Sequence, residues 1–179
     1  AERDQAIRYL EANEKKFLEA VKGLSEAQWN FKPGPDRWSV AECAEHIAVT
    51  ENAIFNGIQK ALKAPPEPEK KELVKGKDEL VLSVVPDRSR KAMAPEPVRP
   101  TGRFADAAAV IAQFRANRAR TIAFTRETSE DLRSRFFRHF ALGDFDLYQW
   151  LLFAAAHSER HIAQMKEVKA DPNFPRNRR

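Results

Sequence analysis

Four histidines are present in the 179-residue chain: His46, His139, His157 and His161. His157 and His161 are four residues apart, and on a helix this spacing places both imidazoles on one face, with about 5–6 Å between their Cβ atoms. Two imidazoles in that arrangement can bind one metal ion, as in zinc sites built on an H-x-x-x-H helix. The same spacing also occurs in ordinary helices, where one histidine is hydrogen-bonded and the other lies near the surface.

The helix face on which the pair falls favours the metal site. Steps of three and four residues back from His157 and His161 reach apolar positions such as Trp150 and Leu147, so the pair belongs to the stripe expected to face the interior. Two buried histidines without a metal would each have a donor and an acceptor to satisfy. His46, from an earlier segment, could supply a third ligand. Three histidine ligands leave the fourth position of a tetrahedral site open, as in catalytic zinc sites.

Cys43 and His139 are the other candidates for metal chemistry. Cys43 lies one helical turn before His46 and, as a thiolate ligand, would close the site. A lone helical cysteine is more often a small buried hydrophobe, and we predict that role. With a single cysteine no intramolecular disulfide is possible, which favours a reducing compartment. His139 lies in a less regular stretch, and we predict that it packs or faces solvent.

Several polar residues fall on or beside the inward stripes and could orient a ligand histidine or the metal-bound nucleophile. These candidates are Asn13, Glu14, Asn117 and Gln164. The alternative is that each lies at the edge of its stripe in solvent. Trp38 and Trp150 are predicted to anchor the core.

Proline and glycine delimit the elements that must position these residues. Segments free of both cover residues 1–22, 103–142 and 144–171, and residues 36–64 contain only Gly57. Apolar residues recur in these segments at the spacing of amphipathic helices. Ser39 and Glu42 form a capping-box pattern before the second helix, and Asp144 or Asp146 is expected to cap the fourth. No period-2 run or hairpin turn pair is present. The sequence therefore predicts an all-α four-helix bundle.

The bundle is expected to occupy residues 1–171 as one domain, with a short capped turn at Ser25–Gln28. Seven of the eleven prolines lie between positions 65 and 100, so residues 65–104 are predicted to form a Pro-rich excursion between helices two and three. This excursion could include a helix over Glu69–Val85. Arg133–Phe140 is predicted to continue the third helix or to form a short helix beyond it. Residues 172–179 are expected to form a basic tail.

The charge pattern has two interpretations, a nucleic-acid-binding surface and a solvated face. The net charge is +5, and seven arginines lie between Arg115 and Arg138. Clustered arginines can neutralise phosphates, but these lie at many helical angles and no recognition motif accompanies them. A solvated face is therefore predicted, with no nucleic-acid partner. The longest apolar run, Trp150–Ala156, is far shorter than the ~20 residues of a membrane span. The polar start of the chain shows no signal-peptide pattern, so a cytoplasmic location is expected. An apolar outer strip could support a homodimer.

Two segments of the chain resemble signatures of the DinB/YfiT-like four-helix-bundle metalloproteins. Arg37–Ile47, RWSVAECAEHI, is similar to the helix-two signature of that family, and His157–Gln164, HSERHIAQ, is similar to its helix-four signature. By this resemblance His46, His157 and His161 would bind nickel or zinc. The family includes thiol-cofactor-dependent S-transferases, a mycothiol-dependent isomerase and metal-dependent hydrolases.

These observations lead us to expect a metal-dependent enzyme that acts on a small molecule. The metal would act as a Lewis acid and lower the pKa of a bound nucleophile. If that nucleophile is a low-molecular-weight thiol, the protein is an S-transferase, which the resemblance favours slightly. If it is water, the protein is a hydrolase. The remaining alternative is a non-enzymatic metal-binding or interaction protein. No residue stands out as a general base.

Overall fold

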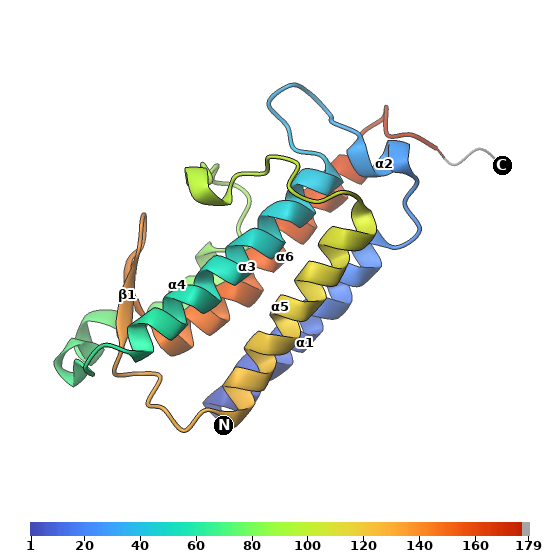
Figure 1. Cartoon of the computed structure of the whole chain (residues 1–179). Helices are drawn as coiled ribbons and strands as arrows, with labels where there is room; N and C mark the ends of the chain where they lie inside the picture. Colours follow the sequence, from blue (N-terminus) through green and yellow to red (C-terminus); the bar gives the residue numbers. More distant parts are fainter. Residues whose placement is uncertain (177–179) are drawn as a thin grey trace.

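The computed structural model describes residues 1–176. Within them, four long helices form a bundle: α1 (Glu2–Val21), α3 (Val40–Leu62), α5 (Ala107–Glu127) and α6 (Leu147–Lys169) (Figure 1). Each helix contacts two neighbours, in the ring α1–α6–α3–α5. The predicted four-helix bundle is confirmed, with one small hairpin added to it. In this described part of the chain, no helix is long and apolar enough to cross a membrane.

Helices α3 and α6 begin at capping side chains that the sequence predicts. The Ser39 hydroxyl accepts a hydrogen bond from the Glu42 backbone N–H (3.1 Å), and the Glu42 carboxylate accepts one from the Ser39 N–H (2.8 Å). Asp146 and Gln149 make the same reciprocal pair at the start of α6 (2.7 and 3.1 Å), so Asp146 is the cap and Asp144 is not. Ser25 begins the short helix α2 (Glu26–Asn30) with a third capping box.

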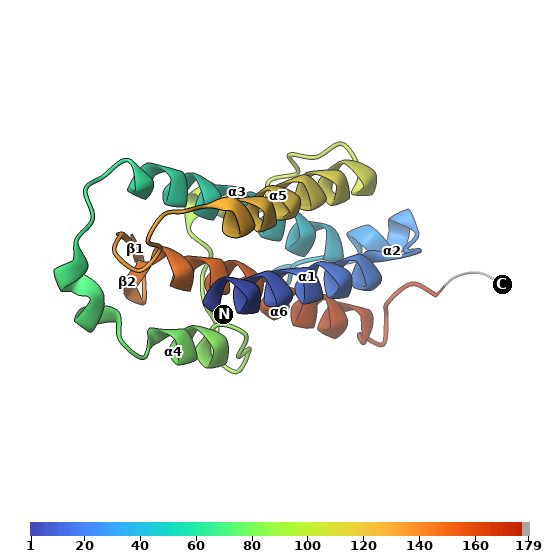
Figure 2. The same cartoon turned by 90° about the horizontal axis from the view of Figure 1, so that it is seen from below.

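The long excursion follows from the directions of the helices. α1 and α6 run one way along the bundle, whereas the neighbours α3 and α5 both run the other way (Figure 1). The chain must therefore return along α3, about 34 Å for 23 residues, before α5 begins. It does so through the 3-10 helix η1 (Pro68–Val74), α4 (Lys77–Val84) and residues 86–106, which contain the 3-10 helix η2 (Glu96–Val98). α4 packs beside α6 (Figure 2). The helix suggested over Glu69–Val85 is thus confirmed only in part, because Gly76, at φ 78°, separates η1 from α4.

The helix predicted over Arg133–Phe140 is wrong. Strands β1 (Phe136–His139) and β2 (Gly143–Asp146) form an antiparallel hairpin in which Phe137 lies opposite Phe145. Helix α5 ends at Glu127, well before this segment. The Phe137 ring stacks on Trp150 with 4.1 Å between centroids, so the hairpin is held by packing against α6. A strand of four residues is too short for alternation to show in the sequence.

A layer of polar residues divides the bundle core into two apolar halves. One half includes Leu10, Ile54, Ile58 and Leu151. The other includes Phe17, Cys43, Phe114 and Met165. Each long helix contributes a buried polar side chain at a chain position between those two sets: Asn13, Glu51, Arg118 and Ser158.

Arg118 is the centre of this polar layer. Its guanidinium pairs bidentately with Glu51 (Nε–Oε1 2.7 Å, Nη2–Oε2 2.9 Å). It also donates to the Leu10 carbonyl (2.6 Å) and the Ser158 hydroxyl (2.9 Å). The pair is 0% and 2% exposed in its side chains. The prediction that the arginines form a solvated face is therefore wrong for Arg118. Its contacts join all four helices.

The other arginines of the predicted face divide into two groups. Four are exposed, as predicted: Arg115, Arg120, Arg126 and Arg138. Arg133 and Arg135 are half-buried, and both form ion pairs with carboxylates. The predicted tail is described only to residue 176. There the Phe174 ring packs edge-on against Phe31, and residues 177–179 lie outside the described chain.

Candidate metal centre

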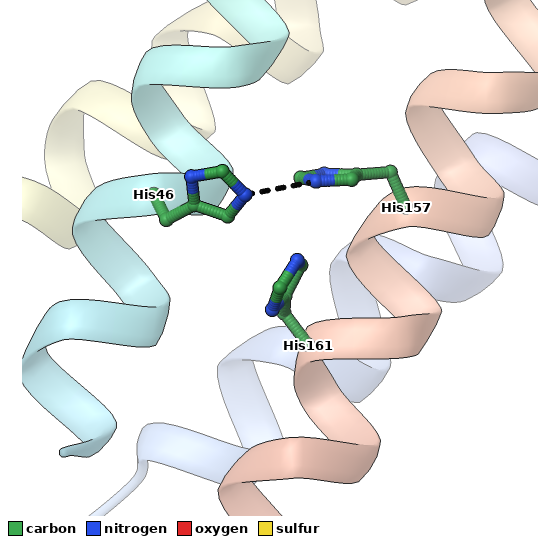
Figure 3. Close-up of side chains that lie close together, drawn as sticks. All are labelled: His46, His157 and His161. Carbon is green, nitrogen blue, oxygen red and sulfur yellow. Dashed lines mark hydrogen bonds between the residues drawn. The ribbon is translucent and has the colours of Figure 1, made fainter. Parts of the chain in front are cut away.

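The three histidines singled out in the sequence meet between α3 and α6. His46 comes from α3, and His157 and His161 come from successive turns of α6. One ring nitrogen of each lies within 4.8 Å of those of the other two. The Nε2 atoms of His46 and His157 are 3.0 Å apart, and Figure 3 shows the three rings directed toward one another. Helical packing thus joins residues 111 positions apart in the chain.

Hydrogen bonds fix the orientation of two of these rings. His46 Nδ1 lies 2.7 Å from the Val98 carbonyl oxygen, and His161 Nδ1 lies 2.8 Å from Gln164 Oε1. Both partners only accept, so each Nδ1 carries the proton and donates it. The Nε2 atom of each neutral ring then presents a lone pair toward the cluster, which is the tautomer a metal ligand needs.

His157 forms the open side of the cluster. It is half-buried, whereas His46 and His161 are 3% and 7% exposed. Its ring stacks on Phe153 (centroids 5.6 Å apart, 18° between planes). His157 is therefore the least buried of the three histidines.

The surroundings keep all three rings neutral. Burial lowers the pKa of His46, although the Val98 carbonyl and Glu45 act in the opposite direction. Burial lowers the pKa of His157 and of His161 well below the ordinary 6.5, and the neighbouring histidines lower both further. A neutral imidazole is the form that binds a metal, so the cluster needs no deprotonation at neutral pH.

The donor set fits a divalent transition metal. Imidazole suits zinc, copper, iron and nickel. Bonds of about 2.0–2.1 Å to a tetrahedral ion put neighbouring nitrogens about 3.3 Å apart, close to the 3.0 Å between His46 and His157. Without a cation, the Nε2 lone pairs of His46 and His161 face the same space. His157 Nε2 can donate at most one proton, so only one of these two lone pairs can accept a hydrogen bond from it.

Cys43 and His139 lie outside the cluster, as predicted. Cys43 is fully buried in the apolar half of the core, and burial raises the pKa of its thiol. It is not part of the potential ligand group found among the described residues. His139 is 9% exposed and its Nδ1 accepts hydrogen bonds from the N–H groups of Ala141 and Leu142. Burial lowers its pKa to about 4.

The two tryptophans have different roles. Trp150 anchors the core, as predicted, and its Nε1 donates to the Phe137 carbonyl (3.1 Å). Trp38 is only half-buried, and its ring stacks over His161 (5.7 Å, 25°) and meets His46 edge-on (4.9 Å). The prediction that Trp38 anchors the core is confirmed in part, because Trp38 packs against one apolar half of the core and also forms a wall of the histidine cluster.

Of the four polar candidates, Gln164 contacts a cluster histidine directly. Asn117 instead donates to the Ala48 carbonyl (2.9 Å) and accepts from Gln113. Asn13 donates to the Tyr9 carbonyl within α1, and its buried Oδ1 has no partner among the described residues. Glu14 is half-buried, and within residues 1–176 none of these three hydrogen-bonds His46, His157 or His161.

The functional contact that sequence reasoning missed is the Val98 carbonyl. A backbone acceptor has no residue signature, and Val98 lies in the Pro-rich excursion, 52 positions from His46. The three prolines around it, Pro95, Pro97 and Pro100, were the available signal, because they indicate a restrained backbone rather than a loose loop.

Comparisons with known proteins agree with this fold. The family model of the DinB superfamily matches residues 9–165. The uncharacterized protein YuaE of Bacillus subtilis (strain 168) is 30% identical over 149 residues, covering 83% of this chain and 88% of YuaE. A solved structure, YfiT from Bacillus subtilis, matches with a TM-score of 0.62 and 18% identity over 97% of this chain and 89% of that one. YfiT is described as a probable metal-dependent hydrolase with an unusual four-helix bundle topology.

Proposed function

Because this chain belongs to the DinB superfamily, we propose that His46, His157 and His161 bind one divalent transition metal, nickel or zinc, in a metal-dependent enzyme that acts on a small molecule. One observation carries the proposal. Two Nε2 lone pairs, each fixed by a hydrogen bond at the opposite ring nitrogen, point into one space beside a third imidazole. Hydrogen-bonded partners of this kind are typical of histidines that ligate metals.

When bound, the metal supplies a Lewis acid that polarises a ligand and lowers its pKa. The residues of this chain provide the surroundings. The indole of Trp38 covers His161 and His46 and limits the access of water there. His157 is the least buried of the three histidines, so we expect a substrate to reach the cluster from the His157 side.

Transfer of a thiol group is the reaction we favour. The ligand group found in the described residues contains histidines only, and the carboxylate of the neighbouring Glu45 is occupied by hydrogen bonds from Thr101, Gly102 and Arg103. A thiol has an ordinary pKa of about 8.5 and loses its proton far more readily than water, at about 15.7. A site whose ligand group includes no carboxylate therefore suits a low-molecular-weight thiol as nucleophile.

Hydrolysis is the second candidate, favoured by the description of YfiT as a probable metal-dependent hydrolase. Both reactions use the same three histidines and differ in the nucleophile. A screen of the zinc- and nickel-loaded protein against electrophiles with and without added thiols separates them. Turnover only with a thiol supports transfer, and turnover in its absence supports hydrolysis.

Metal analysis tests the site itself. The purified protein is expected to hold about one divalent metal per chain, because three fixed imidazoles form one site. Replacing His46, His157 or His161 by alanine should reduce occupancy sharply. His139→Ala is the matched control, since His139 is a buried histidine outside the cluster. Equal loss of metal in His139→Ala would refute the assignment of the three ligands.

A further inference from the structure

Residues 86–106, which we call the strap, contact one of the two oriented histidines directly and the other through Gln164. The Val98 carbonyl accepts the hydrogen bond from His46 Nδ1 (2.7 Å). Arg88 donates from Nη1 to Gln164 Oε1 (3.4 Å), the oxygen that accepts from His161 Nδ1 (2.8 Å). One segment of the excursion thus reaches a ligand on α3 and a ligand on α6.

The strap is fastened to α6 by arginine contacts. Arg88 pairs bidentately with Glu167 (Nε–Oε1 2.6 Å, Nη2–Oε2 2.8 Å). Arg160, one residue before His161, donates to the backbone carbonyls of Asp87 and Arg90. Bidentate arginine–carboxylate pairs fix geometry as well as adding energy, so the position of the Arg88 guanidinium beside Gln164 is well determined.

The strap is fastened to α3 by a buried carboxylate. Glu45 is 5% exposed and lies next to His46 in the chain. It accepts hydrogen bonds from the backbone N–H groups of Thr101 (2.8 Å) and Gly102 (2.9 Å) and from Arg103 Nη1 (3.2 Å). Between the two anchors many strap side chains face solvent, and Met93 is 79% exposed. Near the C-terminal end of the strap Phe104 packs against one apolar half of the core, whereas the part between the two anchors is held mainly by polar contacts.

We propose that strap closure and metal binding are coupled. The closed strap holds the Nδ1 protons of His46 and His161, so their Nε2 lone pairs are preorganised for the ion. By linkage, an ion that binds better to the closed form must also favour closure by the same factor. Arg88 is in this sense a positioning residue, which acts on His161 through Gln164. The inference rests on the proposed metal site and adds its regulation by residues 86–106.

The affinity for Zn²⁺, measured by competition with a chromophoric chelator, tests this coupling. Arg88→Gln should weaken binding about 10–100-fold, the usual effect of removing a contact behind a ligand. Arg90→Gln is the matched control, because it removes the same charge from the same segment and the contact of Arg90 with α6 is through its backbone carbonyl. It should change the affinity less than about twofold. Gln164→Leu removes the acceptor from the α6 side and should weaken binding as Arg88→Gln does.

Hydrogen exchange supplies a readout that does not depend on affinity or activity. In the unsubstituted protein, Zn²⁺ should slow amide exchange at Thr101 and Gly102, whose N–H groups donate to Glu45 of α3 and are bonded there only when the strap is closed. In Arg88→Gln this protection should shrink, while exchange in the four long helices stays unchanged.

The outcomes separate the two proposals. If the unsubstituted protein binds no Zn²⁺, the proposed metal site fails. If it binds Zn²⁺ but Arg88→Gln and Gln164→Leu bind equally well, and exchange in the strap does not respond to the ion, the coupling is refuted while the metal site stands. Far-ultraviolet circular dichroism of each variant confirms that the bundle is folded before either conclusion is drawn.

Discussion

Removing one partner of the buried Arg118–Glu51 pair should destabilise the bundle far more than removing both. In Arg118→Met, the Glu51 carboxylate stays 2% exposed and loses both hydrogen bonds from the guanidinium. In Glu51→Leu, the Arg118 guanidinium stays fully buried without its counter-ion. Leaving one charge of such a pair buried and unpaired costs about 3–5 kcal/mol of unfolding free energy.

The double variant removes both charges and replaces them with apolar side chains of similar length. The other groups that Arg118 contacts retain alternatives, since Ser158 already donates to the Ala154 carbonyl (2.9 Å). We therefore expect the double variant to lose only about 1–2 kcal/mol relative to the unsubstituted protein, because hydrophobic replacements of buried ion pairs are often close to neutral. The sum of the two single losses is about 6–10 kcal/mol, so the expected coupling energy is several kcal/mol.

Guanidinium unfolding followed by circular dichroism at 222 nm measures all four species of this cycle. The slope of each transition must stay the same for the free energies to be compared. If the loss in the double variant equals the sum of the two single losses, the pair is not the unit that stabilises the polar layer. A single variant that loses less than about 1 kcal/mol would show that water reaches the remaining charge, and the burial argument would fail.

Three further changes test other parts of the fold. Gly57→Ala should lower the thermal midpoint, because its Cβ would lie 2.8 Å from Phe137 ring carbons and overpacking costs about 1–3 kcal/mol; a higher midpoint would contradict this. Unfolding free energy should fall as pH drops from 6.5 to about 4, by up to about 3 kcal/mol through His139, because the unfolded state takes up that proton first. His139→Asn should flatten this pH dependence; an unchanged slope would refute the contribution. Cys43→Ser should leave metal content unchanged at a cost of about 1–2 kcal/mol, and a sulfur-to-metal band in the cobalt-substituted protein would show instead that Cys43 is a ligand.

The long helices and the histidine cluster were predictable because their signals are local. Breaker-free segments and capping boxes such as Ser39–Glu42 act within one turn of backbone. The i, i+4 spacing of His157 and His161 fixes a shared face on any helix. The arrival of His46 beside them depends on tertiary packing, and the helix stripes together with the family resemblance were enough to predict it.

The burial of Arg118 and Glu51 was not predicted because charged residues are usually expected to be exposed to solvent. Their positions did carry a signal. Arg118 is four residues from both Phe114 and Ile122 on α5, and Glu51 lies between Ile47 and Ile54 on α3, so both charges fall on apolar stripes. Opposite charges at inward positions of two helices indicate a buried ion pair. Counting the arginines without considering their helical positions does not show this.

The hairpin was missed for a different reason. Its strands have four residues each, and Phe136, Phe137 and Phe140 show no period-2 pattern. Its stability comes from contacts distant in sequence, above all Phe137 against Trp150 and beside Gly57. Such packing produces no local sequence pattern. The only sign of it is the small residue, Gly57, which leaves space for the Phe137 ring.

The use of a main-chain oxygen at Val98 has a consequence for how this site can evolve. Any residue at position 98 presents a backbone carbonyl to His46. The residue type at this position can therefore change without loss of the hydrogen bond that orients His46. Selection acts instead on the path of the backbone, which Pro95, Pro97 and Pro100 restrict. Descendants of this chain can therefore exchange the exposed side chains of the strap, and with them the surface that an incoming molecule meets, while the three imidazoles keep their geometry.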